Sequence, residues 1–251
     1  MEIAGLKEID WTAPWLAPFA GIGRDVSAAG DWRSALNRHA RQRKLCTAGG
    51  QPLVFDAPDA AQAEAYEAFI ARSGHVPTRA NLHDFFNALA WLRFPRSKAR
   101  LNTLQSAEIA RAGIGATRGP LRDAATLIDE NAVFLVTQRT DLVDALRRHD
   151  WTRLFCEERK AWGGQVKVFA FGHALLEKLA RPYKAITAHA LHVTLPGTAD
   201  ADSIDAAAAS LLDDRLSPRR LLPLPVLGIP GWSAANADPS FYRDTAVFRP
   251  T

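Results

Sequence analysis

The most regular pattern of apolar and polar positions in this chain lies between residues 81 and 94. Asn81 can cap a helix start through its side-chain oxygen, and the pattern predicts a helix from Leu82 to Phe94 that ends at Pro95. At about 100° per residue, the apolar side chains fall on one face of this helix. They are Leu82, Phe85, Phe86, Leu89 and Leu92. We expect this face to pack against the core.

The other side of the same helix carries an unusual set of polar side chains. His83, Asn87 and Trp91 recur one turn apart, and Asp84 lies beside them. A solvated helix face more usually carries Lys, Glu or Gln, which solvate well and favour helix. The polar stripe therefore indicates a site or a buried polar patch.

A second helix is predicted directly after this one. Ser97 can cap it, and the pattern continues to about Ala112. Its approach and first turn carry Arg96, Lys98 and Arg100, whose positive charge opposes the helix dipole. Either these side chains reach into water, or an anionic group sits at the helix start, where backbone N–H groups point outward.

The rest of the chain alternates between the two periodicities. We expect helices at residues 31–44, 59–74, 121–129, 141–148, 151–162, 172–180 and 203–212, and strands at 52–55, 132–137, 165–171 and 185–195. The segment 165–195 has a βαβ-like order, from which we infer parallel pairing. Residues 1–26 predict an N-terminal strap, and the Pro/Gly-rich residues 216–251 a C-terminal wrap. The prediction is an α+β fold: a helix-rich single domain with a small mixed β-sheet near residues 132, 165 and 185.

Composition narrows the class of protein. The chain has 251 residues, of which 47% are hydrophobic and 23% charged, so it can bury a core and is not a disordered chain. The formal net charge of +4 permits an anionic ligand without demanding nucleic acid. Cys46 and Cys156 are the only cysteines, which excludes a zinc finger and favours a reduced, cytoplasmic setting. We expect neither a leader nor a membrane span.

His83, Asp84 and Asn87 form the first candidate for chemistry. An imidazole and a carboxylate within one turn can be metal ligands or an acid–base pair, because histidine titrates near neutral pH and carboxylates bind hard cations. The structural alternative is that His83 and Asn87 bridge backbone groups in a buried polar patch.

His173 and Glu177 form the second candidate. His173 opens a helix directly after a strand, and Glu177 lies one turn on, so both side chains share a face. Such strand–helix junctions commonly hold ligands, and a histidine ligand can take a carboxylate as its hydrogen-bond partner. The alternative is a histidine held by capping hydrogen bonds. Whether the helices of His83 and His173 meet does not follow from the sequence.

A third group of charges flanks the helix at 121–129. Arg122 and Asp123 lie early in it and Asp129 and Glu130 at its end, so the four cannot form one local cluster. Acids near a helix C-terminus oppose the dipole, so we expect them to have a partner. A salt bridge is the favoured partner, and a metal ion is the alternative.

Five segments in order along the chain resemble an uncharacterised bacterial family catalogued as domain of unknown function 3025. They are HDFFNALAWLRFPRSKARLN (83–102), RDAATLIDEN (122–131), FGHALLEK (171–178), PLPVLGIPGW (223–232) and FYRDTAVFRP (241–250). The resemblance implies a bacterial protein of this layout, and it brings no established activity, cofactor or catalytic residue.

The leading hypothesis from the residues is a hydrolase-like enzyme, metal-assisted in one version, that acts on an anionic or phosphorylated substrate. A divalent metal is held by His83, Asp84 and His173, and catalysis uses these residues with Asn87 and Glu177. The residues expected to bind substrate are Trp91, Arg96, Lys98, Asn102 and Arg122. The rival hypothesis is a non-catalytic module that binds an anionic ligand, nucleic acid or a protein partner, with architectural polar motifs.

Overall fold

The computed structural model describes residues 2–59, 63–113 and 119–250. Its helices are α1 (Ala20–Ala28), α2 (Trp32–Gln42), α3 (Tyr66–Ser73), α4 (Leu82–Arg93), α5 (Pro95–Ala112), α6 (Pro120–Asn131), α7 (Thr140–Arg147), α8 (His173–Leu179) and α9 (Ala201–Leu211). Its strands are β1 (Val54–Asp56), β2 (His75–Pro77), β3 (Ala132–Thr137), β4 (Val166–Ala170), β5 (Thr187–Val193) and β6 (Leu222–Pro225). The fold is α+β and helix-rich, as predicted, and its described strands form two small sheets where one was expected.

The main sheet has the strand order β4-β3-β5-β6, and β1 pairs with β2 separately. Strand β3 lies at the centre, antiparallel to β4 and parallel to β5. All six residues of β3 are buried, which its uninterrupted apolar sequence requires. The predicted parallel βαβ unit at 165–195 is wrong, because β3 pairs between β4 and β5 and these two strands run in opposite directions.

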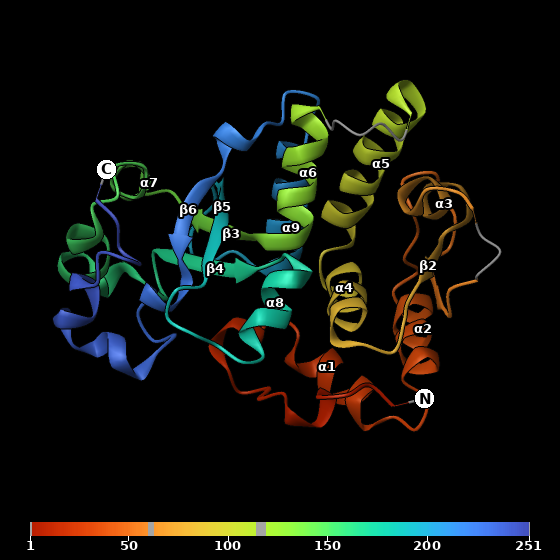
Figure 1. The fold of residues 1–251 in the computed structure, drawn as a ribbon, viewed down its shortest axis with the longest axis horizontal. Helices are drawn as coiled ribbons and strands as arrows, with labels where there is room; N and C mark the ends of the chain where they lie inside the picture. Colours follow the sequence, from red (N-terminus) through yellow and green to blue (C-terminus); the bar gives the residue numbers. More distant parts are fainter. Residues whose placement is uncertain (1, 60–62, 114–118, 251) are drawn as a thin grey trace.

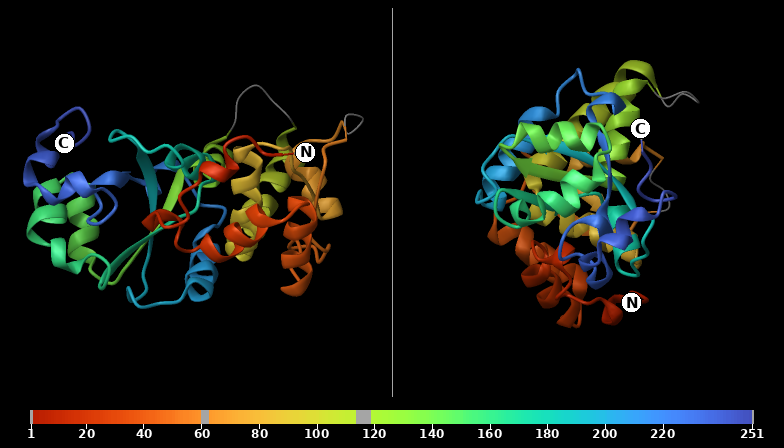
Figure 2. Two further views of the ribbon diagram at one scale, coloured as in Figure 1. Left: turned by 90° about the horizontal axis from the view of Figure 1, so that it is seen from below. Right: turned by 90° about the vertical axis from the view of Figure 1, so that its left-hand side faces the viewer.

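The helices form successive layers outward from one face of the sheet (Figure 1). Helices α6, α8 and α9 lie next to the sheet, α4 and α5 pack on these, and α2 and α3 with β1 and β2 form the outer layer. Helix α7 and the C-terminal segment lie on the other side of the sheet, as the view from below also shows (Figure 2, left). The middle layer is covered on both sides, so α4 is buried from Asp84 to Leu92, beyond its predicted apolar face.

Several predicted boundaries shift for local reasons. Helix α5 begins at Pro95, which occupies the first turn where its missing N–H costs nothing, and Ser97 is not its cap. The helix predicted at 59–74 begins at Tyr66 among the described residues, and 60–62 lie outside them. Strand β2 was not among the predicted strands. Residues 153–157 form a π-helical turn within the segment predicted as helix 151–162.

The N-terminal and C-terminal segments both pack on the core. The N-terminal segment includes α1 and places Phe19 against Phe94 of the α4–α5 junction, with ring centroids 5.8 Å apart. Trp15 lies 5.8 Å from Trp232 of the C-terminal segment, measured between ring centroids. Among the described helices, none is long and apolar enough to cross a membrane.

Candidate metal centre

Three helix ends meet at one point and bring together side chains from distant parts of the sequence. His83 lies in the first turn of α4, His173 is the first residue of α8, and Glu130 is in the last turn of α6. Gly172 makes the approach possible: a Cβ there would lie 2.4 Å from the Asn131 backbone nitrogen and 2.5 Å from the Glu130 carbonyl carbon. Only glycine lets the start of α8 lie this close to the end of α6.

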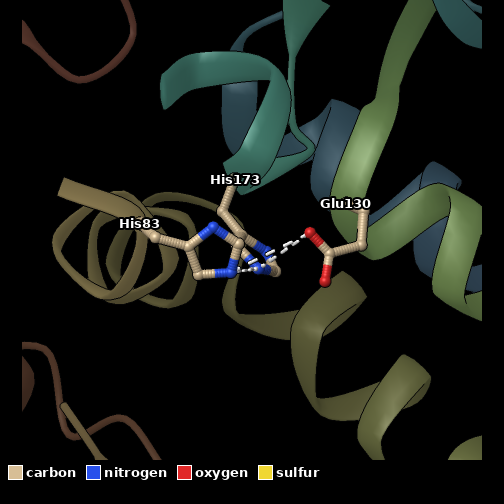
Figure 3. A group of neighbouring side chains, drawn as sticks. All are labelled: His83, Glu130 and His173. Atoms are coloured by element: carbon tan, nitrogen blue, oxygen red, sulfur yellow. Dashed lines mark hydrogen bonds and ion pairs between the residues drawn. The ribbon is translucent and has the colours of Figure 1, made fainter. Parts of the chain in front are cut away.

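The two imidazoles and the Glu130 carboxylate point at each other (Figure 3). His83 Nε2 lies 3.0 Å from His173 Nε2, and Glu130 Oε2 lies 3.3 Å from His173 Nε2 and 4.0 Å from His83 Nε2. Donor atoms that each lie about 2.0–2.2 Å from one metal ion are roughly 3–3.5 Å apart. Of these three separations, only that between His83 and Glu130 exceeds this range. Among the described residues, these three form the group whose donor atoms lie close enough to share an ion.

The outer nitrogens of both rings face carboxylates. His83 Nδ1 is 3.0 Å from Glu177 Oε2, and because a carboxylate only accepts, this nitrogen carries the proton. His173 Nδ1 is buried without a hydrogen-bond partner, and Asp129 Oδ2 at 3.8 Å is the nearest carboxylate oxygen given for it. The two Nε2 atoms, 3.0 Å apart, form a hydrogen bond in which one ring donates to the other. With both Nδ1 atoms protonated, both Nε2 lone pairs would instead be free for a shared cation, and carboxylates beside the outer nitrogens are typical partners of metal-ligating histidines.

Burial keeps His173 in its neutral form. The His173 side chain is 7% exposed, and this burial lowers its pKa to about 4, although the nearby Asp129 opposes the shift. The neutral imidazole is the form that binds metal. Burial and the neighbouring Asp129 raise the pKa of Glu130. A cation between these groups would favour the ionised carboxylate.

A buried ion pair holds Asp129, the carboxylate next to His173, in place. Lys98 of α5 donates to Asp129 Oδ1 and, at 2.7 Å, to Asn87 Oδ1. Burial alone would raise the pKa of Asp129, but Lys98 and His173 outweigh it and hold the pKa below its ordinary value. Asn87 Nδ2 in turn donates to the Tyr66 hydroxyl at 3.0 Å. The network connects α3, α4, α5 and α6 and fixes the carboxylate that faces His173.

The centre opens into a cavity of about 500 Å³. We call His83, Glu130 and His173 the triad. The described residues that line the cavity come from β1 and the segment after it, from α3, from the loop before α4, and from the helix ends that carry the triad. His83, Glu130 and His173 all line this cavity. A metal ion held by the three would therefore be accessible to a small molecule.

The structure brings together some of the predicted catalytic and metal residues and separates others. His83, His173 and Glu177 meet, which the sequence left open. Asp84, predicted as a ligand, lies outside the triad: its carboxylate caps Arg79, accepting from Nε at 2.9 Å and Nη2 at 3.0 Å. Glu130 stands where Asp84 was expected. Asn87 belongs to the supporting network.

The predicted substrate-binding residues lie away from the cavity walls, and most are occupied within the protein. Trp91 is buried, with Lys98 Nζ 5.4 Å from its ring. Asn102 donates to Glu67 Oε2 at 2.7 Å. Arg122 is partly buried and is not among the described residues that line the cavity.

The anionic group expected at the start of α5 is a carboxylate of the chain itself. The backbone N–H groups of Arg96 and Ser97 donate to Asp205 of α9 at 2.9 Å. The positive end of the α5 dipole is therefore neutralised inside the protein, and the start of α5 offers no open site for an anion.

Sequence reasoning missed Glu130 as the third donor and Tyr66 and Glu67 as cavity residues. The signal for Glu130 was present: an acid at a helix C-terminus needs a partner, and a metal ion was one of the two considered. Tyr66 and Glu67 gave no signal, because in sequence they look like ordinary residues of an amphipathic helix.

The comparisons with known proteins give a family but no activity. The model of a family described as "Protein of unknown function (DUF3025)" matches residues 53–251. No curated protein and no solved structure matches the chain. The matched range contains all three donors and every residue that lines the cavity.

Proposed function

From the premise that this chain belongs to the DUF3025 family, we propose that it is a metal-dependent enzyme of the hydrolase type. His83, His173 and Glu130 hold one divalent cation. The observation that carries the proposal is the convergence of two imidazole nitrogens and a carboxylate oxygen within 3.0–4.0 Å, with a carboxylate facing the outer nitrogen of each ring. Two histidines and one carboxylate are a ligand set of catalytic zinc and of non-haem iron.

The geometry suits activation of water. Three protein donors leave coordination positions for a water molecule and for a substrate oxygen, and the cavity gives access to them. A bound divalent cation lowers the pKa of its water towards neutrality and polarises a carbonyl or phosphoryl group. A cation held by the three donors would supply this chemistry to a bond placed in the cavity. Glu177 would orient the His83 ring through its hydrogen bond of 3.0 Å, and Asp129 would face the outer nitrogen of His173 from 3.8 Å.

The rival function, a binding module for an anionic ligand, nucleic acid or a protein, has less support. A nucleic-acid surface needs unpaired basic side chains on one face. Here Lys98 and Arg79 form ion pairs with buried or partly buried carboxylates, and Asp205 accepts from the backbone at the helix start near Arg96. These three contacts do not favour the rival, and an anionic substrate stays a prediction from the sequence.

Metal analysis of untagged protein tests the proposal. We expect about one equivalent of a transition metal in the purified protein or after reconstitution, and its loss in His83→Ala, His173→Ala and Glu130→Gln. His75→Ala is the matched control, because His75 pairs with Asp56 near the same cavity but is not one of the three donors. Asp84→Asn should also keep the metal.

Two results would contradict the proposal. One is a folded wild-type protein that takes up no Zn²⁺, Fe²⁺ or Mn²⁺ in isothermal titration. The other is unchanged stoichiometry in all three donor variants. If metal binds as expected, a screen of ester, amide and phosphoester substrates with metal-loaded and chelator-treated protein identifies the bond that is cleaved.

A further inference from the structure

Tyr66 is a hydrogen-bonding residue in the wall of the cavity that holds the triad. It is the first residue of α3, is 40% exposed and lines the cavity together with the triad. Its hydroxyl oxygen is 3.0 Å from Nδ2 of Asn87, which lines the same cavity. A tyrosine hydroxyl can donate one hydrogen bond and can also accept, so the direction of this contact decides what Tyr66 offers a ligand.

Lys98 fixes the direction of the contact between Asn87 and Tyr66. Its ammonium group only donates, so the Asn87 atom 2.7 Å from Lys98 Nζ is the acceptor Oδ1. The other end of the same amide is Nδ2, which only donates, and the Tyr66 hydroxyl accepts from it. In the described part of the chain, no protein group accepts the hydroxyl proton of Tyr66. That proton is left for a group bound in the cavity.

The Tyr66 hydroxyl is a neutral donor at pH 7. Desolvation, and then the nearby charge of Glu67 before that of other carboxylates, raises the pKa of Tyr66 well above its usual value, although the bond from Asn87 opposes the shift. An ordinary tyrosine already titrates only near pH 10. The hydrogen bonds that run from Lys98 through Asn87 to Tyr66 start at a cation, and each bond polarises the next, which strengthens the donor at the end.

The same hydroxyl lies near the triad. Asn87 follows His83 by four residues on α4, so their side chains are neighbours, with Cβ atoms about 5–6 Å apart. Lys98, which holds Asn87, also donates to Asp129, the residue before Glu130 in α6. This spacing leaves room for one small group between the hydroxyl and an ion held by the triad.

The kind of donor indicates the kind of bond that is cleaved. Hydroxyl and amide donors stabilise the oxyanion that forms on a carbonyl oxygen in acyl transfer, whereas transferring phosphoryl groups are held by Arg, Lys or metal ions. Arg79 is the one Lys or Arg side chain among the described residues that line the cavity, and Asp84 accepts from its Nε at 2.9 Å and its Nη2 at 3.0 Å. Because this charge is compensated, the cavity suits a carbonyl group better than a phosphoryl group.

We infer that Tyr66 donates a hydrogen bond to the carbonyl oxygen of a carboxylic ester or amide substrate, and that this bond is strongest when the oxygen becomes an oxyanion. The inference deepens the proposed function and rests on it for the reaction. In hydrolysis the water oxygen bonds to the carbonyl carbon and the carbonyl electron pair moves to oxygen. The pair returns as the bond to the leaving group breaks, and the leaving group takes up a proton from the water. Tyr66 keeps its own proton and acts by electrostatic stabilisation, with Asn87 and Lys98 as positioning residues.

Binding to metal-free protein tests the donor apart from the reaction. Benzamide, which has an uncharged carbonyl group, is titrated into ¹⁵N-labelled, metal-free wild type and Tyr66→Phe, which keeps the ring and removes only the hydroxyl. We expect benzamide to shift amide signals around Tyr66, and its Kd to rise about three- to tenfold in Tyr66→Phe, because one neutral hydrogen bond is lost. Tyr183→Phe, at a residue 55% exposed and outside the described lining of the cavity, should leave the Kd unchanged.

Kinetics of metal-loaded protein test the catalytic role. Phenyl acetate and phenyl phosphate share a leaving group and differ in the group transferred. We expect phenyl acetate to be the better substrate, and Tyr66→Phe to lower its kcat about a hundredfold with less than about a threefold change in KM, because the lost bond is strongest in the transition state. Metal stoichiometry should stay as in wild type, since Tyr66 is not one of the three donors. A purely structural role of Tyr66 would not separate kcat from KM in this way.

Four results would overturn the inference. They are no benzamide binding, equal benzamide affinity in wild type and Tyr66→Phe, an unchanged kcat in Tyr66→Phe, and faster hydrolysis of phenyl phosphate than of phenyl acetate. Failure of metal uptake would instead contradict the proposed function. The benzamide titration would then still decide whether Tyr66 offers its proton to a carbonyl group.

Discussion

At the scale of single residues, the site combines two groups whose protonation is shifted in opposite senses. His173 has its pKa lowered to about 4 by burial, so it stays neutral at pH 7, and Glu67 has its pKa raised to about 7 by burial and by Asp129. The neutral imidazole is the form that binds metal. Both shifts arise because the helix layers enclose polar groups without enough counter-charge.

The stability of the protein should carry the signature of Glu67. A carboxyl whose pKa is raised from 4.5 to about 7 by folding binds its proton more tightly in the folded state. Its stabilising effect is complete below about pH 4.5 and is lost as the pH rises through 7. Urea unfolding of wild type and Glu67→Gln from pH 5 to 8 isolates this effect. As the pH rises from 5 to 8, the free energy of unfolding of Glu67→Gln should increase by about 1–3 kcal/mol relative to that of wild type.

The comparison of variant with wild type cancels the opposite contribution of His173, which is lost as the pH falls. A stability difference between wild type and Glu67→Gln that does not change with pH would show that the Glu67 carboxyl is not shifted. Measurement without metal and again with saturating Zn²⁺ separates this titration from metal binding, because the ion adds its own pH dependence.

The sequence predicted single site residues better than their partners. His83 stood out because it belongs to a polar stripe on one face of a helix, and His173 because it opens a helix directly after a strand, with Glu177 one turn on. Asp84 was predicted as a ligand because it lies next to His83 in sequence, whereas in the structure its carboxylate binds Arg79. The third donor, Glu130, comes from a segment 47 residues further on, and only tertiary packing places it there.

At the scale of secondary-structure elements, the centre depends on how closely α8 approaches α6. The backbone of Glu130 and Asn131 lies so close to Gly172 that a methyl group added at Gly172 would overlap with it. Its own N–H donates to the Ala132 carbonyl at 2.9 Å, which ties the start of α8 to the start of β3. One residue therefore sets the distance between His173 and Glu130.

Gly172→Ala should separate these elements. A Cβ at 2.4 Å from backbone cannot be relieved by a rotamer change, so α8 must move and His173 with it. We expect the free energy of unfolding to fall by about 1–3 kcal/mol and Zn²⁺ affinity by at least tenfold. Calorimetric titration and thermal unfolding measure both.

Gly21→Ala is the matched control for Gly172→Ala. Gly21 lies in the exposed part of α1, and an added Cβ meets nothing within 4 Å there. Alanine favours helix, so stability should rise by about 0.5–1 kcal/mol with unchanged metal affinity. Equal metal affinity in Gly172→Ala and wild type would show that the α6–α8 contact does not set the site.

The elements themselves were largely predictable, because caps and periodicity are local. Asn81 caps α4 as expected, and the buried run of β3 was recognised from its apolar residues. Strand pairing was not predictable in the same way: whether residues 165–171 and 185–195 are neighbours depends on β3 lying between them. The covering of α4 on both sides likewise results from packing between layers that lie far apart in sequence.

At the scale of the whole molecule, the N-terminal segment packs against the region that the family model matches, residues 53–251, which we call the family region. The family match begins at residue 53, yet the preceding residues supply buried side chains to the same core. Phe19 is 1% exposed and packs edge-on against Phe94, which sits between the two helices that carry His83 and Lys98. We therefore expect one cooperative unit, as the sequence suggested.

Phe19→Ala tests this cooperativity. Removal of a fully buried ring should lower the free energy of unfolding by about 3–5 kcal/mol, because a cavity replaces its contacts. If the N-terminal segment and the family region are one unit, circular dichroism and tryptophan fluorescence will show a single, coincident transition at a lower denaturant concentration. Tyr183→Ala, at a residue that is 55% exposed, should change stability by less than about 0.5 kcal/mol. Separate transitions in Phe19→Ala, with the fluorescence change preceding the loss of helix, would instead mean that the first 52 residues fold on an independent core.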